Sequence, residues 1–302
     1  MKDKKLFFSN FIIKIIALIA MTIDHIGVID FFNNSTITLI FRIIGRISLP
    51  LFIFLEIEGL SHTHNIKRYL LRLGVMAFII YLAIGFINTP LFMNLINANS
   101  FIRLDTIGNI FLTLFLLALI YYLFTLKNKY LRLLGILPIL FFIGLYIVKE
   151  LSNSVIPYTR YHFLWDGLYP QFDLFALILF GAIYLAYFVL DKLIIESAFK
   201  RDESLILAYK NTTSYQFNKN IAASIAIFIF SLILSILASF TDLDNHLELG
   251  LGIQSYMFLS VIFILFYNGK LGYKNKYLQG AFYLYYPLHI VIIFLIYLLI
   301  SM

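Results

Sequence analysis

Long apolar runs separated by short polar segments make up most of the hydropathy pattern of this chain. A helix needs about 20 apolar residues to cross the hydrocarbon core of a bilayer, and about nine runs reach or approach that length. Backbone groups in lipid have to be satisfied within their own segment, so each run is predicted to be a helix. The predicted spans are 11–30, 37–58, 70–88, 107–125, 132–149, 172–191, 221–239, 250–267 and 281–300.

The composition supports a lipid environment for these helices. Of the 302 residues, 62% are hydrophobic and 13% are charged, and the mean hydropathy is +0.91. A soluble domain is usually about 45–50% apolar and about 25% charged, and a water-facing surface could not accommodate this excess. We therefore predict an all-α, polytopic transmembrane helix bundle in which residues 1–302 form a single domain. Cysteine is absent from the sequence, which excludes disulfides and thiolate metal sites.

The distribution of basic residues predicts the topology. With the N-terminus in the cytoplasm, most of the 23 Lys and Arg residues fall in cytoplasmic segments, as the positive-inside rule requires. This arrangement predicts a multi-pass protein of the inner (cytoplasmic) membrane, with an odd number of spans. It also accounts for the pI of 9.3 without a nucleic-acid partner. The first apolar run resembles a signal peptide, but it lacks a small-x-small cleavage site, so we interpret it as a retained helix.

The longest cytoplasmic loop in this topology covers residues 192–220. It contains the stretch KLIIESAFKRDESLILAYK, which mixes apolar and basic residues in the manner of an amphipathic helix that lies on a membrane surface. We therefore expect an interfacial helix there.

Ionisable residues inside a membrane span are costly and usually face the interior of a bundle. Asp24 and His25 belong to the first span, Arg42 and Arg46 to the second, and His289 to the ninth. At about 1.5 Å per residue, His25, Arg42 and His289 should lie at similar depths in the membrane. Arg42 and Arg46 are spaced i, i+4 and therefore share one helix face. We expect these five residues to form one inward-facing cluster.

Two interpretations of this cluster remain open from the residues alone. In the structural one, Asp24 pairs with Arg42 or Arg46 and fixes helix packing. In the functional one, the cluster is a catalytic or transport centre, because histidine exchanges protons near neutral pH. Arginine forks also suit the recognition of phosphate. A buried histidine beside Asp and Arg fits acyl transfer from a phosphate-bearing donor, although it does not identify that donor.

Two stretches of the sequence carry recognisable motifs. The first covers roughly residues 14–75 and the second roughly residues 265–292, including YNGKLG and FYLYYPLH. The residues of these motifs are Asp24, His25, Gly27, Arg42, Gly45, Arg46, Pro50, Glu58, Gly59, His62, Thr63, Lys67, Arg68, Tyr69, Leu70, Arg72, Tyr267, Asn268, Gly269, Gly272, Phe282, Tyr283, Tyr286, Pro287 and His289. Together they resemble the TraX family, whose members acetylate F-pilin.

The resemblance implies an enzyme. TraX proteins are associated with conjugation and acetylate the N-terminus of F-pilin, and they look related to a larger group of multi-helix transmembrane acyltransferases. It therefore implies an N- or O-acetyltransferase with acetyl-CoA as cytosolic donor substrate. The implied acceptor is an amine or hydroxyl at the outer face of the membrane, on a pilin-like protein or on a glycan. The lipid bilayer is the other expected partner.

The resemblance also suggests roles for individual residues. We expect His25 to act as general base, or alternatively as a transient acetyl carrier, and Asp24 to orient it or stabilise its charge. Arg42 and Arg46 would bind donor phosphates or the developing oxyanion. His289 would be a second acid or base, or a carbonyl ligand, and Tyr286 beside it is a candidate for substrate binding.

A basic loop follows the second predicted span. Lys67, Arg68 and Arg72 lie there, either as a basic patch at the membrane surface or in contact with the ribose phosphate of the coenzyme. His62 and His64 form an H-x-H pair beside them. A metal site needs three or four ligands and no third is evident nearby, so we predict no metal.

Two functions of other classes compete with the acetyltransferase. A proton-coupled transporter could use the same cluster as a relay, but paired repeats of the kind common in transporters are not visible in the sequence. A non-enzymatic scaffold for the assembly of surface structures would need no donor site. Binding of acetyl-CoA separates the scaffold from the enzyme.

Overall fold

The described part of the chain is helical. The computed structural model describes residues 6–28, 34–87, 110–155, 173–240, 251–273 and 275–301, and within these ranges no strand forms apart from one isolated bridge between Phe8 and Tyr267. The all-α prediction is therefore confirmed for these residues. Among the described residues, four helical segments are long and apolar enough to cross a membrane: Asn10–Gly27, Ser35–His62, Leu174–Ala198 and Thr213–Phe240. The total of about nine spans and the cytoplasmic N-terminus stay predictions.

The chain divides into two compact units, which are described separately. One comprises Met1–Ile57 and Leu179–Met302, and the other comprises Glu58–Ile178. The prediction of one domain over residues 1–302 stays a prediction. The first unit contains α1 (Asn10–Val28), α2 (Ser35–Gly45), most of α3 (Ser48–His62), most of α10 (Asp173–Phe188), η2 (Val189–Ile195), α11 (Glu196–Ala198), α12 (Glu203–Lys210), α13 (Thr213–Phe240), α14 (Leu251–Gln254), η4 (Ser255–Ser260), α15 (Val261–Leu265) and α16 (Lys276–Ser301).

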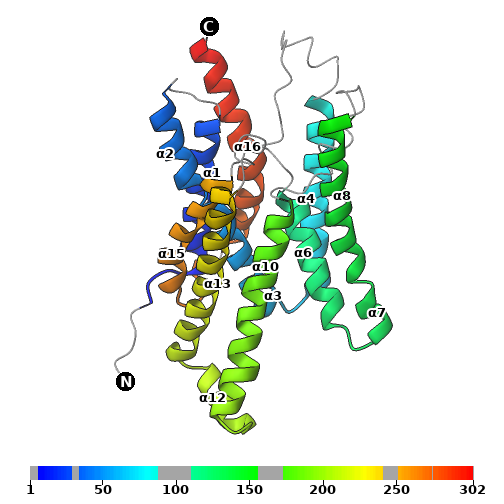
Figure 1. Cartoon of the computed structure of the whole chain (residues 1–302), viewed down its shortest axis with the longest axis vertical. Helices are drawn as coiled ribbons and strands as arrows, with labels where there is room; N and C mark the ends of the chain where they lie inside the picture. Colours follow the sequence, from blue (N-terminus) through cyan, green and yellow to red (C-terminus); the bar gives the residue numbers. More distant parts are fainter. Residues whose placement is uncertain are drawn as a thin grey trace. The chain divides into compact units, whose positions relative to one another are not determined.

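Helix α1 packs against both α2 and α16 in the first unit (Figure 1). Two glycines bring α1 and α2 close together. A Cβ atom at Gly27 would lie 2.9 Å from Cβ of Phe41, and one at Gly45 would clash with the side chain of Asp24. Real Cβ atoms do not approach that closely, so the α1–α2 contact requires a residue without a Cβ atom at both positions.

The second candidate span is broken in the middle. Helix α2 ends at Gly45 and α3 begins at Ser48, and the Ser48 hydroxyl donates to the Gly45 carbonyl at 2.8 Å. Pro50 accounts for the break, because it has no N–H to donate to residue 46 and its ring clashes with that carbonyl. Proline is tolerated in the first turn of the new helix. The break therefore leaves Arg46 at the C-terminal cap of α2.

A loop near residue 268 fixes the start of α1. The backbone N–H groups of Phe7 and Phe8 donate to the Phe266 carbonyl at 2.9 and 3.0 Å, and Asn268 N–H donates back to the Phe8 carbonyl at 2.9 Å. The buried Asn220 of α13 donates to the Tyr267 carbonyl at 2.7 Å. These bonds hold the segment before α1 parallel to the segment before α16.

The segment that joins α10 to α13 is helical too. It passes through η2, α11 and α12, and α13 already begins at Thr213, inside the predicted 192–220 loop. Asp202 caps α12, and hydrogen bonds from the Ser204 hydroxyl and from the backbone N–H groups of Leu205 and Ser204 lower the pKa of Asp202 below its usual value. Leu205 and Leu207 are exposed on α12. Placement of this segment at the membrane surface stays a prediction.

The described part of the second unit contains four complete helices, the last part of α3 and the first part of α10. Its helices are α4 (Ile66–Ile87), α6 (Ile110–Thr125), α7 (Lys129–Leu133) and α8 (Ile136–Val155). Helix α6 packs against both α4 and α8 (Figure 1). Phe115 of α6 would lie 3.3 Å from a Cβ atom at Gly74 of α4, so these two helices also approach closely.

Replacing Gly45 by Ala should push α1 away from α2, because the new Cβ would clash with Asp24. We expect the free energy of unfolding in detergent to fall by about 1–3 kcal/mol, the usual cost of overpacking. Gly181→Ala is the matched control, since nothing lies within 4 Å of a Cβ atom at that position. Equal stability of the two variants would contradict the close α1–α2 approach.

Candidate functional site

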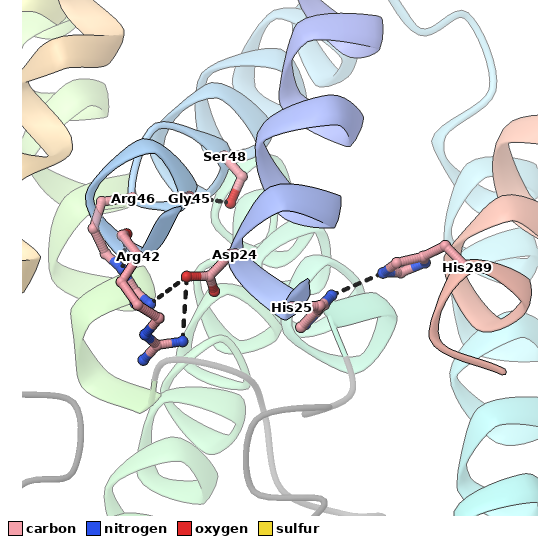
Figure 2. A network of polar contacts seen from close by, with 7 residues as sticks. All are labelled: Asp24, His25, Arg42, Gly45, Arg46, Ser48 and His289. Carbon is pink, nitrogen blue, oxygen red and sulfur yellow. Dashed lines mark hydrogen bonds and ion pairs between the residues drawn. The ribbon is translucent and has the colours of Figure 1, made fainter. Parts of the chain in front are cut away.

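Helix α1 presents two neighbouring polar residues to two different helices. Asp24 faces α2 and His25 faces α16 (Figure 2). Consecutive residues of an α-helix point about 100° apart, so adjacent side chains serve different faces. Both residues are buried, with 8% of Asp24 and 5% of His25 exposed.

The carboxylate of Asp24 binds both arginines of α2. Its Oδ1 atom accepts from Arg46 Nη2 at 2.7 Å and from Arg42 Nη1 at 3.2 Å. Arg46 also donates through Nε to the Arg42 carbonyl at 3.2 Å, so the i, i+4 pair is held as a unit. The three side chains together carry a formal charge of +1. The ion pair between Asp24 and the arginines, which the structural interpretation predicts, is therefore present in the molecule.

The two histidines form a direct contact. His25 Nδ1 lies 2.8 Å from His289 Nε2, and the ring centroids are 5.0 Å apart. His289 Nδ1 lies 3.0 Å from the backbone carbonyl oxygen of Tyr285. Residues far apart in the sequence thus form one chain of hydrogen bonds across the α1–α16 contact (Figure 2).

This chain of hydrogen bonds fixes the tautomers of both imidazoles in their neutral forms. A carbonyl oxygen only accepts, so His289 Nδ1 carries a hydrogen and donates to Tyr285. His289 Nε2 must then accept, which requires a hydrogen on His25 Nδ1. The remaining nitrogen of His25, Nε2, therefore carries a lone pair and is the basic atom of the pair.

Two tyrosines surround the His289 imidazole. The Tyr285 ring stacks on it with a centroid distance of 5.3 Å and an interplanar angle of 7°. The buried Tyr286 ring contacts it edge-on at 5.8 Å. The Tyr285 hydroxyl lies 2.7 Å from Oγ1 of Thr22, one turn of α1 before His25. We predicted Tyr286 from the sequence but not Tyr285, although the i, i+4 spacing of Tyr285 from His289 was a signal for it.

The structure brings together six of the nine residues selected from the sequence. Asp24, His25, Arg42, Arg46, Tyr286 and His289 belong to the first unit and meet around α1. Within this group Asp24 makes its ion pairs with the arginines, and His289 supplies the hydrogen bond that orients His25. The role that we assigned to Asp24, to orient His25 or to stabilise its charge, stays a prediction.

The remaining three residues begin α4 in the second unit. Lys67, Arg68 and Arg72 are all exposed there, and the Arg72 guanidinium lies 5.8 Å from the centre of the Tyr69 ring. Their backbone is ordered by Asn65, whose side chain accepts from Arg68 N–H at 3.0 Å. His62 is also exposed, with Nδ1 at 2.7 Å from the Glu58 carbonyl. Within the described ranges no three His, Asp or Glu side chains are grouped closely enough to hold a metal ion.

The arrangement provides a buried base and a buried cation on two sides of one helix. A neutral imidazole with a fixed lone pair accepts a proton from an incoming nucleophile. An arginine pair with one net positive charge favours an anionic group, such as a phosphate or an oxyanion.

Comparison with known proteins yields one family and one curated relative. The family model described as TraX protein matches residues 9–200. That match includes Asp24, His25, Arg42 and Arg46, and it ends before α16 and His289. A probable fimbrial assembly protein FimC, serogroup H1, from Dichelobacter nodosus is 41% identical over 73 residues, which are 23% of this chain and 30% of the relative. The chain thus covers less than a third of that relative's length, and no solved structure matches.

Removing the charge of Asp24 should destabilise the first unit. In Asp24→Asn, the buried Arg46 and the half-buried Arg42 lose their carboxylate, and breaking a buried ion pair from one side costs about 3–5 kcal/mol. We expect a corresponding loss in the free energy of unfolding in detergent. Glu196→Gln is the matched control, because its 2.5 Å pair with Lys192 lies at the surface and screening makes such pairs weak. A stability of Asp24→Asn equal to that control would contradict the structural role of the ion pair.

Proposed function

Because this chain belongs to the TraX family, we propose that it is an acetyltransferase of the inner membrane. It moves an acetyl group from cytosolic acetyl-CoA to an amine or hydroxyl at the outer face of the membrane. The observation that carries the proposal is the buried His25–His289 pair, in which the hydrogen-bond chain leaves a lone pair on His25 Nε2. A structural ion pair would explain Asp24 and the arginines, but it would not explain two neutral imidazoles in series.

In the proposed reaction His25 is the general base. The acceptor nitrogen attacks the thioester carbonyl while its proton moves to Nε2 of His25, and a C–N bond forms. The C–S bond then breaks, and the proton on Nε2 passes to the leaving sulfur to give the free thiol of coenzyme A. His289 orients His25 through the hydrogen bond at Nδ1 and shares the positive charge that develops on the imidazole. An acceptor hydroxyl would follow the same steps with a C–O bond.

Arg42 and Arg46 would serve the anionic parts of this reaction. Their net positive charge beside Asp24 suits either the oxyanion of the tetrahedral intermediate or a phosphate of the donor. Because Asp24 holds both guanidinium groups in place, little reorganisation is needed when negative charge develops. Lys67, Arg68 and Arg72 remain candidates for binding the nucleotide part of acetyl-CoA.

We propose a pilus-related protein as the acceptor class. The matched family and the name of the Dichelobacter nodosus relative, a fimbrial assembly protein, both point to pilus or fimbrial assembly. A pilin-like protein with a free α-amino group fits a reaction that uses a general base at an amine. A surface glycan is the alternative acceptor.

Acetylation in cells should leave a mass difference on one surface molecule. We expect mass spectrometry of surface proteins and glycans to find the mass of one acetyl group in cells with the gene and to lose it on deletion. Complementation by the intact gene should restore the modification. An unchanged surface proteome and glycome would argue against the acetyltransferase.

The role of His25 predicts a large loss of activity with intact donor binding. We expect His25→Ala to lower the rate of thiol release from acetyl-CoA by at least about 100-fold, the usual contribution of a general base. The assay uses purified protein and a synthetic peptide with a free α-amino group. His62→Ala is the control, because His62 is exposed on the second unit and should leave the rate unchanged. Wild-type turnover in His25→Ala would refute the proposal, and a wild-type protein that binds no acetyl-CoA would favour a scaffold.

A further inference from the structure

The strongest feature that the proposed mechanism does not use is the contact between Thr22 and Tyr285. It lies on the same α1–α16 contact as the imidazole pair. Thr22 precedes His25 by three residues and Tyr285 precedes His289 by four. The two contacts therefore lie about one helical turn apart along the parallel helices α1 and α16. Neither residue belongs to the set that the sequence analysis selected.

The direction of this hydrogen bond follows from a second contact. The Thr22 hydroxyl donates its only hydrogen to the Leu18 carbonyl at 2.8 Å. Its oxygen can therefore only accept from Tyr285, whose hydroxyl donates over 2.7 Å. The phenolic hydrogen is thus engaged with α1 and is not directed at the imidazoles. This geometry fits an anchor and not a general acid.

Tyr285 touches His289 in two further ways. Its backbone carbonyl accepts from His289 Nδ1 at 3.0 Å, which fixes the tautomer of that ring. Its phenol ring lies almost parallel to the imidazole, at 7°, which restricts the tilt of the ring. One residue thus sets the tautomer, the tilt and, through Thr22, the position of His289 relative to α1.

We propose that Tyr285 and Thr22 are positioning residues that hold His289 in register with His25, so that the base nitrogen of the pair is always Nε2 of His25. Without the anchor, α16 could shift or rotate on α1, and the 2.8 Å contact between the imidazoles would lengthen. His25 would then exchange between its two neutral tautomers, and only one of them presents a basic Nε2. The kinetic consequence rests on the proposed function, whereas the tautomer itself does not.

The variants separate an anchor from a merely structural residue. Tyr285→Phe keeps the stacked ring and the backbone carbonyl but loses the donor, and Thr22→Val loses the acceptor with little change in volume. Thr22→Ser retains a hydroxyl and should behave as the wild type. Tyr277→Phe is the matched control on the same helix, because Tyr277 is 85% exposed.

The test that does not depend on activity is nitrogen-15 NMR of histidine-labelled protein in detergent micelles. Ring nitrogens with and without hydrogen differ in chemical shift, and the His25 and His289 signals are identified by their loss in His25→Asn and His289→Asn. In the wild type we expect both rings to carry hydrogen on Nδ1. In Tyr285→Phe and Thr22→Val we expect a mixture of tautomers for His25, with none in Thr22→Ser or Tyr277→Phe. A single tautomer in both hydroxyl-deficient variants overturns the inference.

The kinetic test uses the peptide acetylation assay. We expect Tyr285→Phe and Thr22→Val each to lower kcat about tenfold, the equivalent of one hydrogen bond, with little change in KM for acetyl-CoA. The double variant should be no worse than either single one, because both remove the same bond. Additive losses, or a change confined to KM, overturn the inference. If the wild type transfers no acetyl group, the proposed function fails while the NMR result still decides the role of Tyr285 and Thr22.

Discussion

A carboxylate buried between two guanidinium groups is the interaction on which this site depends. A charge inside an apolar bundle is tolerated only when an opposite charge and hydrogen bonds compensate it. Asp24 meets this condition with Arg42 and Arg46, and it can do so only because Gly45 leaves room for its side chain. Once Asp24 faces α2, the geometry of the helix turns His25 toward another neighbour, α16. The ion pair therefore sets the orientation of the base.

The charged side chains and the proton-exchanging side chains of the site lie apart. Both arginines bind Oδ1 of Asp24, whereas the hydrogen on His25 Nδ1 is bound by His289. A neutral imidazole accepts that hydrogen bond without placing another charge in the bundle. The permanently charged groups thus lie on one side of α1, and the groups that exchange protons lie on the other (Figure 2). In the proposed reaction the first set would stabilise an anion and the second would move a proton.

The sequence predicted the helices and the residues of the site better than it predicted which side chains contact one another. Long apolar runs allow few structures other than helices, and ionisable residues within them have to face inward, so Asp24, His25, Arg42, Arg46 and His289 could all be selected. Spacing along one helix gave the Arg42–Arg46 pair correctly. It could not reveal which neighbouring helix each side chain meets, because that depends on tertiary packing. The interaction of His289 with the Tyr285 backbone carbonyl was invisible for the same reason, since every residue has such a carbonyl.

The separations along the chain have a consequence for biosynthesis. The carboxylate and its arginines are 18 and 22 residues apart, whereas the two imidazoles are 264 residues apart. Chains are made and inserted from the N-terminus, so Asp24 can bind Arg42 and Arg46 as soon as α1 and α2 have been synthesised. The imidazole pair can form only when α16 has been synthesised. A product that ends before α16 would lack the imidazole pair, so the paired base of the proposed reaction depends on the synthesis of α16.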